Sequence, residues 1–364
     1  MKKNVWLLGA AVAALTSCTQ SEVLDVPEGK KIQFESFVEK PTRAVSDLLP
    51  STFTKAWIFG YCVPNTNPTG TPNFTSFNDD PTVVESVFAE TPLTKNDDTW
   101  GVDDEKHWKT NYSYRFAGYS NGNSKLENGI VSYNPETDVL NISSYNVVDY
   151  DDGGTPKDLV AAIAGDRHSS TGATPVNFQF RHLLSKITFY ITNASGNADL
   201  HLTDIKLNNV HKTAKCVCTY QNSVTESYPK NVGWTSIGDA QEFNIEDIIV
   251  SHAAGSTTHQ EITYYVIPQL NASATLTLLL QEKMGGDVHY SKIETFSLNT
   301  GVTNVRTDYS VTNAWVPGYH YKYTLTRGTT FNQIEFNVNI DTWNEDRDGN
   351  GSYEDGDNVS LQGS

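Results

Sequence analysis

The sequence is dominated by short runs in which apolar and polar residues alternate with a period of two. Successive side chains of a strand point to opposite faces, so each run predicts a half-buried strand. The clearest runs place these residues on one face: Ile187, Phe189 and Ile191; Tyr319, Tyr321, Tyr323 and Leu325; Ile334, Phe336, Val338 and Ile340. Beyond the N-terminus no run has a sustained apolar stripe at helical spacing. The pattern predicts an all-β chain built of antiparallel β-sandwiches.

Length and charge limit what the chain does. Its 364 residues suggest two domains, and 43 acidic against 26 basic side chains give a formal net charge of -17. An acidic surface repels phosphate backbones and anionic lipid headgroups, so we expect no nucleic-acid partner.

The N-terminus has the pattern of an export signal. Lys2 and Lys3 precede an apolar stretch at 5–15, which is about half of the roughly 20 residues that cross a bilayer. The stretch ends in Leu-Thr-Ser followed by Cys18, which resembles the lipobox of bacterial lipoproteins. We therefore expect residues 1–17 to be a signal peptide and Cys18 to be acylated, which anchors the protein outside the cytoplasm. The alternative is an ordinary secretory signal with a chance cysteine.

Three further cysteines do not suggest a disulfide framework. Cys216 and Cys218 lie in a strand-like run, and we expect their side chains to point to opposite faces and pair poorly. Cys62 leaves an odd count, so buried free thiols are the prediction for all three.

Residues 18–43 form a tether with one strand-like piece. Within it Ile32, Phe34 and Val38 share a face, and the proline at 41 ends the strand. Arg43 then falls in an exposed loop, where the Arg43–Ala44 bond is open to a trypsin-like protease.

Loop-rich segments suggest how the remaining chain is divided. Residues 63–82 and 149–156 are rich in turn-forming residues, and the predicted domain boundary lies near 170–179. We expect one sandwich at 44–175, a second at 176–343 and an acidic tail at 344–364.

Two motifs resemble functional sites, one of a hydrolase and one of a calcium-binding loop. Ser120 lies in a G-x-S-x-G pattern, but a hydrolase needs a helix after that serine and the following residues lack helical pattern. The tail has the spacing of an EF-hand-like calcium loop, with candidate oxygen ligands from Asp346, Asp348, Asn350 and Asp357. The flanking helices of an EF-hand are missing, so a solvated acidic tail is the alternative. We expect no catalytic residue and no cofactor.

Several motifs, in order along the chain, resemble the fimbrillin family of Bacteroidales surface lipoproteins. The resemblance covers roughly residues 1–343 and rests on these segments: Trp108 followed by Tyr112, Tyr114, Phe116 and Tyr119; Asp158-Leu159-Val160-Ala161; Phe180, His182 and Leu184-Ser185-Lys186-Ile187; Tyr265-Val266-Ile267-Pro268-Gln269; Trp315, Pro317-Gly318, Tyr321 and Tyr323-Thr324; Phe336, Val338, Ile340 and Trp343.

The resemblance implies two transthyretin-like β-sandwich domains and a non-enzymatic role as a fimbrial subunit. It also implies a precursor lipidated at Cys18 and displayed at the outer membrane. An Arg-specific surface protease would cut after Arg43 and release the strand that carries Ile32, Phe34 and Val38. A strand from another fimbrial subunit would then fill the groove, if residues 32–38 occupy an edge position of the first sandwich. The donor strand of this family comes from the partner's C-terminal region, which in this chain is the acidic tail, so the place in the fibre stays open.

Two other functions remain open at this stage. A monomeric surface lipoprotein that binds glycans or host ligands would need exposed Trp and Tyr side chains along one surface. A surface hydrolase would need a histidine within reach of the Ser120 hydroxyl.

Overall fold

The computed structural model describes residues 29–38, 53–65, 77, 83–97, 99–147, 157–164, 167–168, 175–219, 231–244, 250–254, 260–299, 313–328 and 334–342. All twenty-one elements named within these ranges are strands, grouped into four sheets, which confirms the predicted all-β fold. In this part of the chain no helix has the length and apolar character to cross a membrane.

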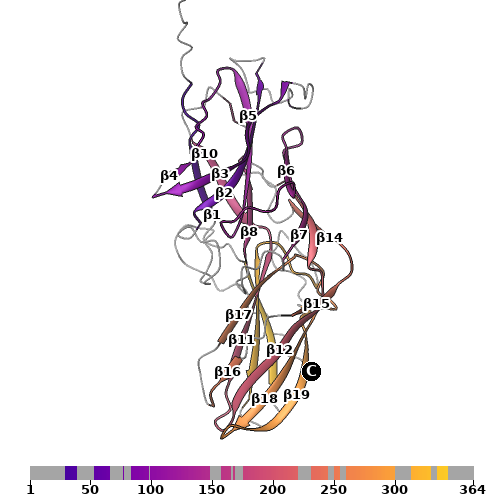
Figure 1. Cartoon of the computed structure of the whole chain (residues 1–364). Helices are drawn as coiled ribbons and strands as arrows, with labels where there is room; N and C mark the ends of the chain where they lie inside the picture. Colours follow the sequence, from indigo (N-terminus) through magenta and orange to yellow (C-terminus); the bar gives the residue numbers. More distant parts are fainter. Residues whose placement is uncertain are drawn as a thin grey trace, which may run out of the picture.

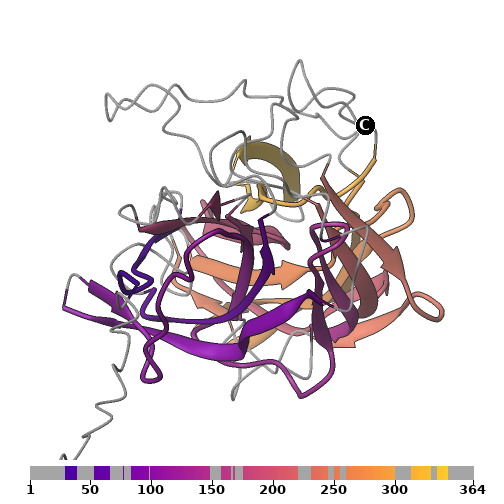
Figure 2. The same cartoon turned by 90° about the horizontal axis from the view of Figure 1, so that it is seen from above.

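The largest sheet has eight strands in the order β2-β3-β4-β1-β10-β8-β5-β9. Its strands are β1 (Phe34–Val38), β2 (Lys55–Pro64), β3 (Glu85–Asn96), β4 (Thr99–Gly101), β5 (Tyr112–Asn121), β8 (Leu159–Ile163), β9 (Arg167–His168) and β10 (Val176–His182). An additional pairing of β2 with β5 closes seven of these strands into a ring in which β1 is one link. Seen from above, the purple strands curve around an interior and do not lie flat (Figure 2).

A four-stranded sheet packs on one side of this ring. It runs β14-β13-β7-β6 and consists of β6 (Val131–Asn134), β7 (Val139–Asn146), β13 (Thr213–Cys218) and β14 (Val232–Ser236). The central strand β8 is buried on both faces. Its Leu159, Ala161 and Ile163 pack toward the four-stranded sheet, whereas Val160 and Ala162 belong to the core inside the ring.

The other two sheets enclose a separate core. One runs β17-β11-β20-β21 and consists of β11 (Ser185–Asn193), β17 (Gln260–Val266), β20 (Tyr319–Arg327) and β21 (Ile334–Thr342). The other runs β15-β12-β18-β19, with β16 also paired to β12, and consists of β12 (Asp199–Val210), β15 (Gln241–Asn244), β16 (Val250–His252), β18 (Thr275–Met284) and β19 (Asp287–Ser297). Figure 1 shows these strands below the ring, along the long axis of the molecule.

Strands from both sides of residue 175 share the upper sheets. β10 begins at Val176 and pairs with β1 and β8. β13 and β14 lie further along the chain, yet β13 pairs with β7. The segment 176–343 therefore contributes strands to both groups, and the chain does not pass from one to the other at a single point near residue 175.

The three described cysteines are buried free thiols, as predicted. The expectation that Cys216 and Cys218 point to opposite faces was wrong, because side chains two residues apart on a strand share a face. Both thiols pack into the core between the ring and the four-stranded sheet.

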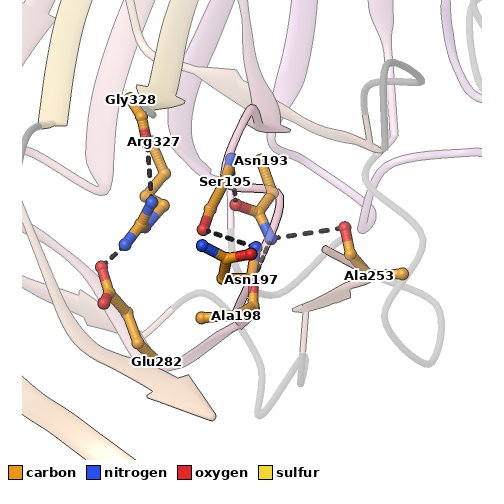
Figure 3. A network of polar contacts seen from close by, with 8 residues as sticks. All are labelled: Asn193, Ser195, Asn197, Ala198, Ala253, Glu282, Arg327 and Gly328. Atoms are coloured by element: carbon orange, nitrogen blue, oxygen red, sulfur yellow. Dashed lines mark hydrogen bonds and ion pairs between the residues drawn. The ribbon is translucent and has the colours of Figure 1, made fainter. Parts of the chain in front are cut away.

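A buried ion pair connects the two lower sheets. Arg327 Nε at the end of β20 donates to Glu282 Oε1 on β18 over 2.7 Å, and both side chains are almost fully buried. Arg327 Nη1 also donates to the carbonyl of Gly328. Figure 3 shows this pair beside a second polar cluster, in which Asn193 Nδ2 donates to the carbonyls of Ala198 and Ala253.

Candidate assembly site

The position of β1 in the ring is the feature that bears most directly on function. β1 lies between β4 and β10 (Figure 1), parallel to β10 in the register Phe34↔Val176 to Val38↔Phe180. On its other side Phe34 pairs with Trp100 of β4. In the intact chain β1 therefore has a paired strand on each side, so the condition that residues 32–38 occupy an edge position is not met.

Backbone hydrogen bonds extend this docking to the residues before β1. The Ile32 amide donates to the Lys106 carbonyl over 2.8 Å, and the Trp108 amide donates to the Lys30 carbonyl over 3.0 Å. Lys31 forms an exposed ion pair with Glu105. Gly29 precedes these residues, and a Cβ at this position would lie 1.9 Å from the Trp108 carbonyl oxygen. The approach is thus too close for any residue other than glycine without a backbone shift.

Two apolar side chains anchor the segment in the core of the ring. Ile32 is 1% and Phe34 is 5% exposed. The Phe34 ring contacts Phe88 and Phe116 edge-on, with centroids 5.6 Å and 6.3 Å away, and stacks on Phe178. The predicted common face of Ile32 and Phe34 is therefore a buried face. The backbone of Val38 pairs with Phe180, and its side chain lies outside the described residues.

The other neighbour of β10 holds that strand independently of β1. Arg181 and His182 of β10 pair with Ala161 and Val160 of β8. His182 Nδ1 lies 2.7 Å from Asp158 Oδ2, with both side chains fully buried. β10 is thus joined to β8 by contacts that do not involve β1.

The core beside β1 is apolar enough to raise the pKa of a cysteine thiol. Burial raises the pKa of Cys62 to about 12, an effect that outweighs the opposing charge of Lys109. Cys62 and Phe34 belong to the same core cluster. A strand that occupies the β1 position must therefore present apolar side chains to this core.

Several predicted site residues lie outside the described residues. These are the lipidation residue Cys18, the cleavage pair Arg43 and Ala44, and the candidate calcium ligands Asp346, Asp348, Asn350 and Asp357. Among the described residues, no group of three or more His, Cys, Asp and Glu side chains is arranged to hold a metal ion.

The Ser120 hydroxyl forms hydrogen bonds with backbone groups of β2 and of a turn. Its hydroxyl donates to the Lys55 carbonyl over 2.8 Å and accepts from the Asn123 amide over 3.1 Å. Gly122 and Asn123 both have positive φ, so the G-x-S-x-G pattern here forms a turn at the end of β5. No histidine is among the hydrogen-bond partners that the structure gives this hydroxyl in the described ranges.

Exposed aromatic side chains do not form a sugar-stacking surface in the described part of the chain. The exposed large hydrophobic residues there are all aliphatic or Met: Val217, Ile237, Leu270, Met284, Val288 and Ile293. Most Trp, Tyr and Phe side chains that the sequence places on strands belong to the three cores.

Comparison with known proteins decides the family. The model of the fimbrillin-like family matches residues 42–343. The chain belongs to the fimbrillin-like family. Fimbrillin-like proteins are a structural family of fimbrial, adhesion-type subunits at the cell surface, and the resemblance found in the sequence motifs is thereby confirmed. The matched range begins after β1 and ends at Trp343, so both β1 and the acidic tail lie outside it.

Solved structures show similar chains. A fimbrial protein from Bacteroides vulgatus is 17% identical over 86% of this chain and 99% of its own, with a TM-score of 0.49. A candidate cell adhesion protein from Bacteroides uniformis is 15% identical over 86% of this chain and 99% of its own, with a TM-score of 0.47. None of the curated proteins compared with the chain matches it.

Sequence reasoning missed two parts of the docking site. β10 as the parallel neighbour of β1 and the close approach of Gly29 to Trp108 both come from tertiary structure. The only sequence signal for the second was a glycine shortly before an alternating run, which by itself is indistinguishable from a turn residue.

Proposed function

We propose that this fimbrillin-like protein is a subunit of a cell-surface fimbrium that is exported as a lipoprotein and assembled by strand exchange. In this proposal Cys18 carries the acyl anchor of a precursor at the outer membrane. An Arg-specific surface protease cuts between Arg43 and Ala44, the segment 18–43 leaves, and a strand of another subunit takes its place.

The single observation that carries the proposal is the placement of β1 as one link of a closed ring. Residues 29–38 are joined to the rest of the ring through residues 39–52 only, so a cut after Arg43 leaves them attached by noncovalent contacts alone. Burial of an Ile or Phe side chain contributes about 1.5–3 kcal/mol. Among the side chains that the structure describes in this segment, Ile32 and Phe34 supply the buried apolar part of the attachment, together with the hydrogen bonds to β10, β4 and residues 106–108.

Departure of β1 would leave a groove with a specific recognition chemistry. Its sides are the freed edges of β10 and β4, which carry backbone donors and acceptors. Its floor includes Phe88, Phe116 and Phe178. An extended strand with a large apolar residue at the Phe34 position satisfies both, since main-chain hydrogen bonds provide affinity and the pocket provides register.

Treatment of the purified precursor with an Arg-specific protease tests the maturation step. We expect a cut after Arg43, loss of the N-terminal segment, and oligomers that resist SDS. The Arg43→Ala variant should stay intact and monomeric under the same treatment. Arg43→Lys is the matched control, because it keeps the positive charge but removes the arginine side chain that the protease recognises. Equal oligomer formation by Arg43→Ala would disprove the strand-release step.

Detergent partitioning tests the lipid anchor separately. In cells that export the protein, we expect the wild-type precursor to enter the detergent phase and a Cys18→Ser variant to remain in the aqueous phase. Identical partitioning of both would refute acylation at Cys18 and leave the cleavage step unaffected.

A further inference from the structure

β19 is a long strand at the edge of its sheet. It pairs with β18 along its whole length, from Thr275↔Ser297 to Met284↔Asp287, with one register shift between Glu282 and Lys283. It is the last strand in the order β15-β12-β18-β19, and no described residue pairs with its other edge. In Figure 1 it lies, in orange, on the outside of the lower group of strands.

The usual protections of an edge strand are only partly present here, in the charged residues Asp287, Lys292 and Glu294. β19 has eleven residues, DVHYSKIETFS, without proline or glycine. Natural edges are commonly short, bulged in the middle, or interrupted by proline or several charges. On β19 the side chains of Val288 and Ile293 are 49% and 67% exposed. Within the described part of the chain, the strand therefore presents an edge without a paired strand, together with exposed apolar side chains.

The edge is also held rigidly. Gly285 and Gly286, both with positive φ, make the tight turn that joins β18 to β19. Glu282 on β18 pairs in register with Tyr290 and is tied to β20 by the buried ion pair with Arg327 (Figure 3). Because β18 is fixed to the opposite sheet, pairing at β19 requires little ordering of the chain.

We propose that β19 pairs antiparallel with β19 of a second copy of this chain. The two strands are related by a two-fold axis that passes between the two copies of Ile293, so that these residues lie opposite each other. An antiparallel contact between identical edges has its axis perpendicular to the sheet, so residues on the same face lie opposite each other. With the axis at Ile293, Lys292 lies opposite the partner's Glu294, and the partner's Lys292 lies opposite Glu294. Tyr290 likewise lies opposite the partner's Phe296.

Charge favours this register over the two neighbouring ones. Lys292 and Glu294 already lie on one face of β19, 2.9 Å apart between Nζ and Oε1. An axis at Lys292 or at Glu294 would place like charges directly opposite, which destabilises a strand pair. A lysine on an edge ordinarily discourages pairing, but in the Ile293 register its opposite neighbour is a glutamate.

Apolar contacts support the same register on the other face. Ile293 pairs in register with the half-buried Leu279 of β18. In the dimer the two copies of Ile293 meet at the axis, flanked on each side by Leu279. The exposed isoleucine thereby becomes the centre of an apolar strip across four strands. One strand pair is a small interface, so we expect a dissociation constant in the micromolar range or weaker. Subunits held close together on one surface would have a high effective concentration, which favours the dimer.

A charge-swap cycle tests the proposal in the full chain carrying Arg43→Ala and Cys18→Ser, in which strand release and acylation cannot contribute. Sedimentation velocity over a micromolar to near-millimolar series should show a monomer–dimer equilibrium. Lys292→Glu and Glu294→Lys should each weaken dimerisation by about tenfold, since each creates two like-charge pairs. The double variant Lys292→Glu/Glu294→Lys should recover it. The matched control is Lys206→Glu, which reverses an exposed charge on β12 of the same sheet and should leave dimerisation unchanged.

Cysteine cross-linking tests the register itself. In the same background, Ile293→Cys lies on the proposed axis and should form a disulfide-linked dimer under mild oxidation, whereas Ser291→Cys should not. The three native thiols in the described residues are buried and do not compete. A chain that stays monomeric throughout the series, or a dimer that neither the charge variants nor Ile293→Cys affects, would overturn the proposal.

Discussion

The ring of Phe34 stacks on the ring of Phe178, with centroids 6.1 Å apart and an interplanar angle of 7°. Phe34 belongs to β1 and Phe178 to β10, so this contact joins the N-terminal segment to a strand from the middle of the chain. Because β1 and β10 are parallel and in register, the stack accompanies a ladder of five residue pairs. Side-chain stacking and backbone pairing thus join the same two strands, β1 and β10.

We expect Phe34→Ala to destabilise the intact chain by about 3–5 kcal/mol, because it removes a buried aromatic ring and leaves a cavity. Urea denaturation of the uncleaved precursor measures the change. Glu35→Ala is the control, since Glu35 is the exposed neighbour on the same strand. Equal effects of the two substitutions would show that the Phe34 pocket does not hold β1.

Gly29→Ala should loosen the segment before β1. The new Cβ would lie 1.9 Å from the Trp108 carbonyl oxygen, so one backbone must move, at a cost of about 1–3 kcal/mol. Hydrogen exchange should then speed up at the Ile32 and Trp108 amides, which donate across this contact. Gly101→Ala has open space around its Cβ and should leave both exchange rates unchanged.

Arg327→Met should destabilise the protein by about 3–5 kcal/mol, because it leaves the buried Glu282 carboxylate without its ion-pair partner. The double variant Arg327→Met/Glu282→Leu should recover most of this loss, since an apolar pair replaces the buried charges. Unfolding free energies of the four proteins in the cycle give the coupling. The exposed pair Lys206–Glu242 is the comparison, and we expect a much smaller loss of stability from breaking it, because solvent screens exposed charges. A loss of similar size in both pairs would contradict the role assigned to burial.

The buried His320 should make stability depend on pH. Burial, and secondarily the charges of Lys186 and Lys322, lower its pKa well below the ordinary 6.5. Below about pH 6.5 the unfolded chain therefore binds a proton that the folded chain does not, so the free energy of unfolding falls as pH decreases toward the lowered pKa. The slope from this group approaches about 1.4 kcal/mol per pH unit.

His320→Gln separates this contribution from that of the carboxyl groups. A glutamine keeps a polar group near the Thr188 hydroxyl, which lies 2.8 Å from His320 Nε2, but does not titrate. Its unfolding free energy should change less between pH 7 and pH 5 than that of the wild type. His289→Gln, at an exposed position of β19, controls for the loss of a histidine as such. A wild-type pH dependence that persists in His320→Gln would refute the assignment.

Period-two patterning predicted individual strands well because it reflects a local property of the backbone. Ile187, Phe189 and Ile191 are buried on β11, and Tyr319, Tyr321, Tyr323 and Leu325 are buried on β20, as expected. The prediction of half-buried strands failed on their opposite faces, where Thr188 and His320 are also buried. These two residues hydrogen-bond each other across the β11–β20 pair, and periodicity carries no information on whether a second layer covers the opposite face.

The sequence alone determined the strand character of the chain, its acidity, the buried free thiols and the motif order that leads to the fimbrillin-like family. These follow from side-chain type and short spacing, which act within a few residues. Only the tertiary structure decided that β1 lies between β4 and β10, that β10 pairs with strands before residue 175, and that β19 is the last strand of its sheet among the described residues. All strand edges offer the same backbone donors and acceptors, so local sequence does not specify which strands pair. The packing of side chains in the cores determines the pairing.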